Sequence, residues 1–285
     1  MELYYNGKLF ELEDDLKTTT NSYEITEEIG SGGNAVVYEC IDRAGNYYAV
    51  KFLLRFTKVA SARFNQEIKL LRQFNNPHIV RYIDNGTITI REKVNGQYKQ
   101  HVTPFLIMEK ADSNLLKYLR NNEDVPYNVY IAQFRGLCEA LMELHNKAVH
   151  RDIKPENILI KGERWILSDF GLCSAIDDSL KIDLTKENEK VGPKFWISPE
   201  AANKFYFGDN VADKIDTYSD VYQLCSVFIF VINKKYPGGI FATSDIKCPL
   251  EQLCKLLISG LSYDPQARPT NGKELYDELN AIIPA

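Results

Sequence analysis

Two short polar motifs near the middle of the chain restrict its fold more than any other feature. The first is residues 150–157, HRDIKPEN, and the second is residues 168–171, SDFG. Asp152 offers a carboxylate that can receive a hydroxyl proton, while Asn157 and Asp169 offer the oxygen ligands that Mg²⁺ prefers. In-line phosphoryl transfer needs these groups around one phosphate, so the fold must bring both motifs to the same place.

The bulk composition is that of an ordinary globular protein. The 285 residues are 45% hydrophobic and 26% charged, which allows a substantial core. A formal net charge of −5 argues against nucleic acid or an anionic membrane as a partner. The six cysteines form no Cys-x-x-Cys pair, and the most apolar run, residues 227–232, is far shorter than the roughly 20 residues that span a bilayer. No signal peptide is predicted, and we expect a cytoplasmic protein.

Strand patterns broken by turns dominate the first part of the chain. Two runs between residues 36 and 52 have strand composition, and the Asn-Gly pair at residues 95–96 joins two longer runs into a predicted hairpin. Residues 59–74 have apolar side chains at helical spacing. A second Asn-Gly pair, at residues 6–7, predicts a short hairpin within the N-terminal segment, residues 1–22.

Helical patterns dominate the second part. Helices are predicted near residues 220–233, 249–261 and 272–283, with Thr270 as the N-cap of the last one. A strand-rich first part followed by a helical second part predicts an α+β fold with two lobes.

These motifs, together with a glycine-rich run at residues 30–37 and Ala49-Val50-Lys51, resemble the catalytic core of the eukaryotic-like protein kinases over almost the full chain. The resemblance implies a kinase domain over residues 23–285. It would have a small β-rich N-lobe with one helix, up to about residue 109, and a larger α-helical C-lobe from about residue 112. The residues before this domain would form an N-terminal extension.

The resemblance also implies ATP as a cofactor. The backbone N–H groups around Gly30, Gly32 and Gly33 would cover the phosphates, with Ala35 in place of the family's third glycine. The other residues that the resemblance assigns to the nucleotide are Val37, Ala49, Lys51, Met108, Glu109, Ala111 and Leu159.

Four residues carry catalytic roles by the same resemblance. Lys51 would bind the α- and β-phosphates, and Glu67, on the predicted helix, would hold its ammonium group in place. Asp152 would orient the acceptor hydroxyl and take its proton, and Lys154 would neutralise charge on the transferred phosphoryl group.

Mg²⁺ is the second implied cofactor, with Asn157 and Asp169 as its ligands. The implied partners are a protein substrate and the chain itself, through autophosphorylation. No nucleic acid and no membrane partner is expected.

Three further residues match positions that fix the C-lobe in protein kinases. Glu200, in the run Ser198-Pro199-Glu200, would form an ion pair with Arg268 and anchor the activation segment. Asp220 would hold the backbone of the catalytic loop from a central helix. Small-molecule kinases usually lack this anchoring, which favours a protein substrate.

The residues that select the acceptor match two different classes of kinase. Lys154 is typical of serine/threonine kinases, whereas Pro193 and Trp196 match the tyrosine-kinase pattern. We give Lys154 more weight because it would act at the transferred phosphate, and we predict a serine/threonine kinase. The alternatives are a tyrosine or dual-specificity kinase, a pseudokinase that only binds partners, and an enzyme that acts on a small molecule or lipid.

Overall fold

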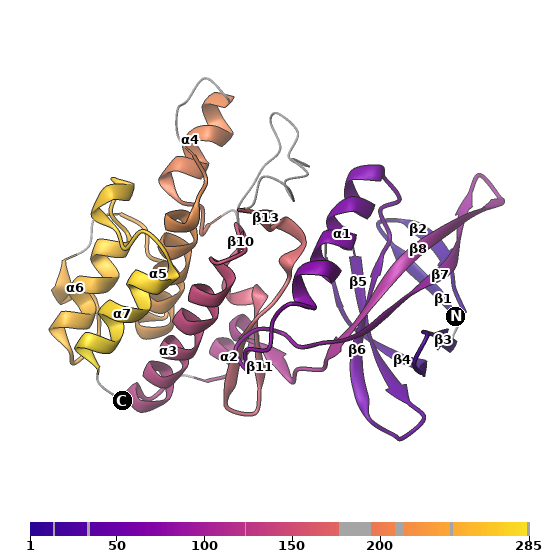
Figure 1. Cartoon of the computed structure of the whole chain (residues 1–285), viewed down its shortest axis with the longest axis horizontal. Helices are drawn as coiled ribbons and strands as arrows, with labels where there is room; N and C mark the ends of the chain where they lie inside the picture. The colour runs from indigo at the N-terminus through magenta and orange to yellow at the C-terminus, as the bar shows by residue number, and fades with distance from the viewer. Residues whose placement is uncertain are drawn as a thin grey trace. The chain divides into compact units, whose positions relative to one another are not determined.

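The chain divides into two compact units, which are described one after the other. The first comprises Met1–Phe74 and Val80–Ala111, and the second comprises Asn75–Ile79 and Asp112–Ala285. The first is rich in strands and the second is mostly helical, which confirms the predicted α+β class (Figure 1). The structure is a computed structural model and describes residues 1–13, 15–32, 35–122, 124–176, 195–208, 214–239 and 242–283.

Antiparallel strands build the first unit. Among its described residues, eight strands form one sheet in the order β1-β2-β7-β8-β6-β5-β4-β3. The predicted hairpin around Asn95-Gly96 is present as β7 and β8, and both turn residues have positive φ, as a tight two-residue turn requires. The strands are β1 (Glu2–Tyr5), β2 (Lys8–Glu11), β3 (Asp15–Lys17), β4 (Ser22–Ser31), β5 (Ala35–Asp42), β6 (Tyr47–Leu53), β7 (Tyr82–Val94) and β8 (Gln97–Glu109).

The helix α1, Lys58–Leu71, lies against β6, β7 and β8. It begins after Thr57, whose hydroxyl oxygen accepts the N–H of Ala60 at 3.2 Å and so satisfies a backbone donor at the helix start. The side chains of Phe64, Ile68 and Leu71 are buried, as their helical spacing predicts.

The opposite face of the sheet forms the core of the first unit. Side chains alternate along a strand, and this alternation places Phe52, Phe105 and Ile107 in one buried cluster. Phe10 and Leu16, from the N-terminal segment, pack into the same cluster. The first residues of the chain therefore contribute to the core.

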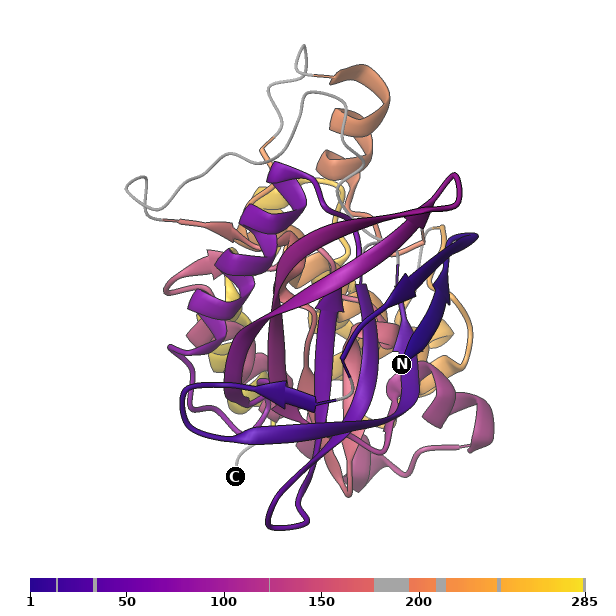
Figure 2. The ribbon, with the colours of Figure 1, turned by 90° about the vertical axis from the view of Figure 1, so that its right-hand side faces the viewer.

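The N-terminal segment reaches both edges of the sheet (Figure 2). The strands β1 and β2 form a hairpin, and β2 pairs with β7, whereas β3 pairs with β4 at the other edge. The hydroxyls of Thr18 and Thr20 donate to Asp84 Oδ2 at 2.6 and 2.7 Å, which ties the connection between β3 and β4 to β7. The strand β3 was not predicted, because three residues are too few to show an alternating pattern.

Helices build most of the second unit. The helix α5 is buried along most of its length, and the ring of Phe228 stacks on Phe134 of α3 with centroids 3.7 Å apart. None of the helices in the described ranges is long and apolar enough to cross a membrane. The helices are α2 (Leu115–Asn121), α3 (Tyr127–Leu144), α4 (Pro199–Phe207), α5 (Thr217–Asn233), α6 (Glu251–Gly260) and α7 (Gly272–Ile282). The short strands are β9 (Ser113–Asn114), β10 (Ala148–Val149), β11 (Ile158–Lys161), β12 (Arg164–Leu167) and β13 (Ser174–Ala175).

The N-cap predicted for α7 was wrong by one residue. The side chain of Asn271, and not of Thr270, accepts the N–H groups of the first turn at 2.9 and 3.1 Å. Close packing against α3 explains this start, because a Cβ on Gly272 would lie 2.4 Å from the backbone nitrogen of Met142. The first helical position must therefore be glycine, and the residue before it becomes the cap.

Candidate active site

One face of the first unit's sheet gathers four of the residues predicted to bind the nucleotide. Val37 pairs across strands with Lys51, and Ala49 pairs with Met108. Antiparallel partners, and residues two apart on one strand, lie on the same face of a sheet, so these four side chains share a face. This is the face that carries α1.

The predicted ion pair between Lys51 and Glu67 is present. Lys51 Nζ lies 2.7 and 2.9 Å from the two carboxylate oxygens of Glu67, which is 2% exposed. Lys51 Nζ also lies 5.9 Å from the ring centroid of Phe64. A carboxylate this buried is costly without a partner, so the pair fixes the lysine on the surface of the sheet.

The glycine-rich turn follows β4 and precedes β5. The N–H of Gly32 donates to the carbonyl of Ala35 at 2.9 Å, and Gly30 pairs with Val37 across the strands. A Cβ on Gly30 would meet no atom within 4 Å among the described residues, so packing does not require a glycine there. Gly33 lies outside the described residues.

A contact that the sequence did not predict reaches this turn from the N-terminal hairpin. The hydroxyl of Tyr5, the last residue of β1, donates to the carbonyl of Gly32. No motif marks Tyr5, and the signal that could have found it is only its place beside the Asn6-Gly7 turn.

The segment predicted to bind adenine ends the first unit. The N–H of Glu109 donates to the carbonyl of Arg81 at 3.0 Å, and the Arg81 N–H donates to Glu109 Oε1 at 3.0 Å. Lys110 forms an ion pair with Glu39 of β5, and Ala111 is the last residue of the unit. The backbone N–H of Glu109 therefore already has a hydrogen-bond acceptor within the protein, the carbonyl of Arg81.

In the second unit, three of the predicted catalytic-loop residues lie together around one carboxylate. Lys154 Nζ lies 2.8 Å from Asp152 Oδ2, and Asn157 Nδ2 donates to the same oxygen at 2.8 Å. Asn157 Nδ2 also donates to the Asp152 carbonyl at 2.8 Å. Burial raises the pKa of Asp152, which is 6% exposed; the nearby charge of Lys154 lowers it in part, and that of Asp169 raises it further.

The second motif brings Asp169 to this loop in a strained backbone conformation. Asp169 has φ of 62° and ψ of 72°, in the left-handed region that few non-glycine residues adopt. The next residue, Phe170, is buried, with its ring 5.1 Å from the ring of His150. Such strain persists only where the surroundings enforce it, and it is common at functional sites. Leu159 lies on β11, opposite Asn114 of β9.

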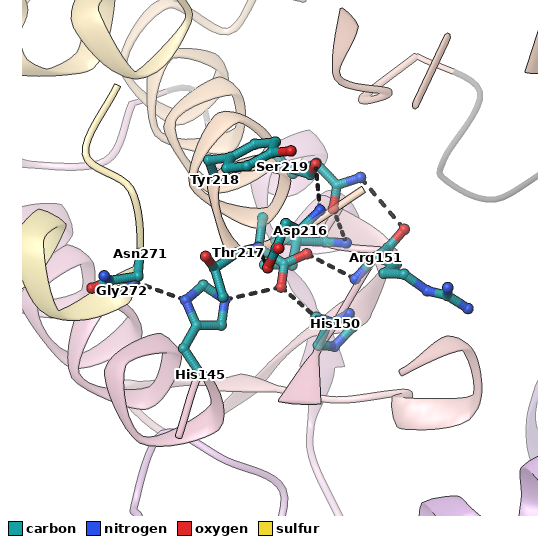
Figure 3. A network of polar contacts seen from close by, with 12 residues as sticks. His145, His150, Arg151, Asp216, Thr217, Tyr218, Ser219, Asn271 and Gly272 are labelled. Carbon is teal, nitrogen blue, oxygen red and sulfur yellow. Dashed lines mark hydrogen bonds and ion pairs between the residues drawn. The ribbon is translucent and has the colours of Figure 1, made fainter. Parts of the chain in front are cut away.

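Asp220 of α5 holds the backbone of the catalytic loop, as predicted. Its carboxylate accepts the N–H of His150 at 2.6 Å and the N–H of Arg151 at 2.8 Å (Figure 3). Gln223, one turn further along α5, accepts the N–H of Ile153 at 2.8 Å. Arg151 has a positive φ of 68°, and these bonds hold it there.

His145 extends this network to α7 and was missed by the sequence analysis. Its Nδ1 accepts the N–H of Gly272 at 2.8 Å, so its Nε2, 3.0 Å from Asp220 Oδ2, must carry a hydrogen and donate (Figure 3). The residue stands at the C-terminal end of α3. The only signal in the sequence is its position shortly before the HRD motif.

Glu200 and Arg268 form the predicted buried ion pair. Two guanidinium nitrogens of Arg268 donate to the two carboxylate oxygens of Glu200, each at 3.0 Å. The hydroxyl of Ser219, on α5, donates to the same carboxylate at 2.6 Å. The start of α4 is thus fixed to α5 and to the segment before α7.

The residue that most favours a tyrosine acceptor, Pro193, lies outside the described residues. Trp196 is buried, and its ring packs edge-on against those of Phe230 and Tyr236 at 5.2 and 5.4 Å. Among the residues that the structure describes, no three or more His, Cys, Asp or Glu side chains group as a metal site that the protein could form unaided.

A strand-rich unit with a buried lysine–glutamate pair, and a helical unit with an aspartate held by lysine and asparagine, define a protein of the kinase type. The family model described as "Protein kinase domain" matches residues 23–279, and the chain belongs to the protein kinase family.

The curated relatives that this chain resembles include several bacterial kinases. A probable serine/threonine-protein kinase of Clostridium acetobutylicum is 28% identical over 286 residues, which cover 92% of this chain and 40% of the relative. One of Streptomyces coelicolor is 31% identical over 269 residues, covering 92% of this chain and 36% of the relative. A serine/threonine-protein kinase of Myxococcus xanthus is 27% identical, covering 91% and 32%. The chain thus spans two fifths or less of the length of these relatives.

Proposed function

We propose that this chain transfers the γ-phosphoryl group of ATP to serine or threonine hydroxyls of proteins, itself included. The observation that carries the proposal is the arrangement around Asp152, a buried carboxylate that both Lys154 and Asn157 contact at 2.8 Å. Relatives of similar sequence are named serine/threonine-protein kinases, which supports the choice of acceptor.

The residues of the first unit would hold the nucleotide. Lys51, fixed by Glu67, would bind the α- and β-phosphates, because its ammonium group is held at a set place on the sheet. Val37, Ala49 and Met108 share the face of Lys51 and would offer apolar area to the base. Gly30 supports this assignment, since its missing Cβ leaves room for a ligand to approach the backbone.

Asn157 and Asp169 would hold Mg²⁺, which neutralises phosphate charge when it is bound. The geometry of Asn157 fits this role, because its amide nitrogen donates twice to Asp152 and its oxygen is the atom left to face a cation. The described residues offer no self-sufficient metal cluster, which agrees with a metal that takes its other ligands from phosphates and water.

Asp152 would receive the proton of the acceptor hydroxyl. The hydroxyl oxygen forms a bond to the γ-phosphorus while the bond from that phosphorus to the bridging oxygen of ADP breaks. Burial raises the pKa of Asp152, which makes its carboxylate a better proton acceptor than an exposed aspartate. Lys154, at 2.8 Å, would balance the charge that the phosphoryl oxygens carry.

A tyrosine or dual-specificity acceptor is the second candidate, and Pro193 together with Trp196 favours it. Lys154 favours the serine/threonine assignment. Phosphoamino-acid analysis of the labelled protein separates these candidates, because it reads the acceptor type directly.

The decisive test is transfer of radiolabelled phosphate from ATP to a protein substrate mixture and to the chain itself. The Asp152→Asn variant keeps the size of the side chain and is the matched control. We expect label on serine and threonine with the parent chain and a loss of about a thousandfold or more in the variant. Equal label with both chains would refute the proposal. If no protein is labelled, the same assay with lipids and small molecules as acceptors would show whether the chain is another kind of phosphotransferase.

A further inference from the structure

The N-terminal hairpin lies outside the region that the protein kinase family model matches, residues 23–279, yet it is built into the first unit. Phe10 is 1% exposed within the core cluster, and Leu3 is buried beside it. Lys8 Nζ lies 2.6 Å from Glu92 of β7, and Glu11 forms an ion pair with Arg91 at 2.7 Å. The hairpin is therefore fixed to the sheet at both its apolar and its polar face.

Tyr5 stands at the end of this hairpin that faces the glycine-rich turn. Asn6 and Gly7 follow it with φ of 49° and 75°, the conformation of a tight two-residue turn, so the position of Tyr5 is well defined. Its ring packs against the core cluster, and its hydroxyl donates to the carbonyl of Gly32. The ordinary tyrosine pKa of about 10 keeps the hydroxyl protonated at neutral pH, and burial raises the pKa of Tyr5 further, so the hydroxyl remains a donor.

The residue that receives this bond, Gly32, directly follows the last residue of β4. Among the described residues, its N–H donates to the Ala35 carbonyl, next to the pairing of Ser31 with Val36. Glycine loses more conformational entropy on ordering than any other residue. A further bond from a rigid donor would therefore reduce the entropy that Gly32 must lose when its backbone contacts a ligand.

We propose that Tyr5 is a positioning residue that holds the backbone of Gly32 in place for nucleotide binding, so that the N-terminal hairpin tunes the affinity for ATP. The inference rests on the proposed function, because it assigns the nucleotide phosphates to the backbone around Gly30 and Gly32. Tyr5 does not touch the reacting atoms, and its effect falls on binding and not on the transfer step.

The test compares Tyr5→Phe with Tyr4→Phe. The first removes only the hydroxyl that donates to Gly32, and the second removes a hydroxyl from the neighbouring side chain, which is 76% exposed. We expect Tyr5→Phe to weaken ATP binding in calorimetry with Mg²⁺ by about threefold to tenfold, the effect of one lost hydrogen bond. The KM for ATP should rise by the same factor, while the rate at saturating ATP changes less than about twofold. Tyr4→Phe should match the parent chain in both measurements.

Amide hydrogen exchange gives a second readout that does not depend on catalysis. Without nucleotide, the amides of residues 30–37 should exchange faster in Tyr5→Phe than in the parent chain, while the amides of α1 keep their protection. Equal exchange and equal ATP affinity in the two chains would overturn the role of Tyr5 and leave the proposed function intact. If the parent chain bound no ATP at all, both the proposed function and this inference would be refuted.

Discussion

The carboxylate of Glu200 receives two hydrogen bonds of 3.0 Å from the guanidinium group of Arg268, and both side chains are buried. Each charge compensates the other in a place that water does not reach. The pair joins the start of α4 to the segment before α7, two parts of the second unit that are distant in sequence.

Removal of Arg268 should therefore unfold the second unit readily. Arg268→Ala leaves the Glu200 carboxylate buried without its charged partner, and we expect a loss of about 3–5 kcal/mol in the free energy of unfolding. Urea denaturation measures this loss. Lys255→Ala is the matched control, because it breaks the exposed pair with Glu251 and should have no measurable effect. Equal stability of the two variants would contradict the importance of the buried pair.

Alanine at two glycine positions should affect two different properties: stability at Gly272 and ATP affinity at Gly30. Gly272→Ala places a Cβ 2.4 Å from the backbone of Met142 and should cost about 1–3 kcal/mol of stability or more, since α3 or α7 must shift. Gly30→Ala meets no described atom within 4 Å and should leave thermal unfolding unchanged. It should instead weaken ATP binding, at least about threefold, because the added methyl group occupies the approach to the backbone. Thermal unfolding and calorimetry on both variants measure stability and ATP affinity. A Gly272→Ala variant as stable as the parent chain would contradict the packing argument.

The pH dependence of the reaction should report on Asp152. Only the ionised carboxylate accepts a proton, and burial favours the protonated form. The acidic limb of kcat/KM should therefore lie above the ordinary aspartate pKa of about 3.9.

Lys154→Met makes this test specific. The ammonium group of Lys154 lowers the pKa of Asp152, so its removal should move the acidic limb to higher pH in addition to slowing the reaction. Lys117→Met, at an exposed position on α2, should leave the limb in place. An acidic limb at the same pH in the parent chain and in Lys154→Met would show that the limb does not belong to Asp152.

The N-terminal segment should matter for stability as well as for the glycine-rich turn. Phe10→Ala opens a cavity in the core cluster of the first unit, and we expect a loss of about 3–5 kcal/mol. Tyr4→Ala removes an exposed ring from the adjacent strand and should have little effect. Chemical denaturation compares the two, and a small effect of Phe10→Ala would mean that the segment is not part of the cooperative core.

The resemblance to protein kinases predicted the contacts that the family's motifs mark. It implied the pair of Lys51 with Glu67 and the pair of Glu200 with Arg268, and the structure places each pair in contact. The hairpin of β7 and β8 follows from Asn95-Gly96, whose left-handed conformation few other residues adopt.

The contacts that sequence reasoning missed depend on tertiary geometry. His145 joins Asp220 to Gly272 only because α3, α5 and α7 pack together, and no spacing rule connects these three positions. Tyr5 contacts Gly32, 27 residues further along the chain, because the folded sheet brings the end of β1 close to the end of β4. The N-cap of α7 is Asn271 and not the predicted Thr270 for the same kind of reason, since contact with α3 sets where the helix begins.

The two outermost strands of the sheet, β1 and β3, have 4 and 3 residues, whereas the strands that lie inside them include β4 with 10 residues and β7 with 13. A long exposed edge strand carries unpaired N–H and C=O groups, with which a strand of a neighbouring molecule can pair. Because the first residues of the chain end the sheet in short strands, we expect them to protect it against self-association. A truncated protein that begins at β4 would lose this protection and should aggregate during expression.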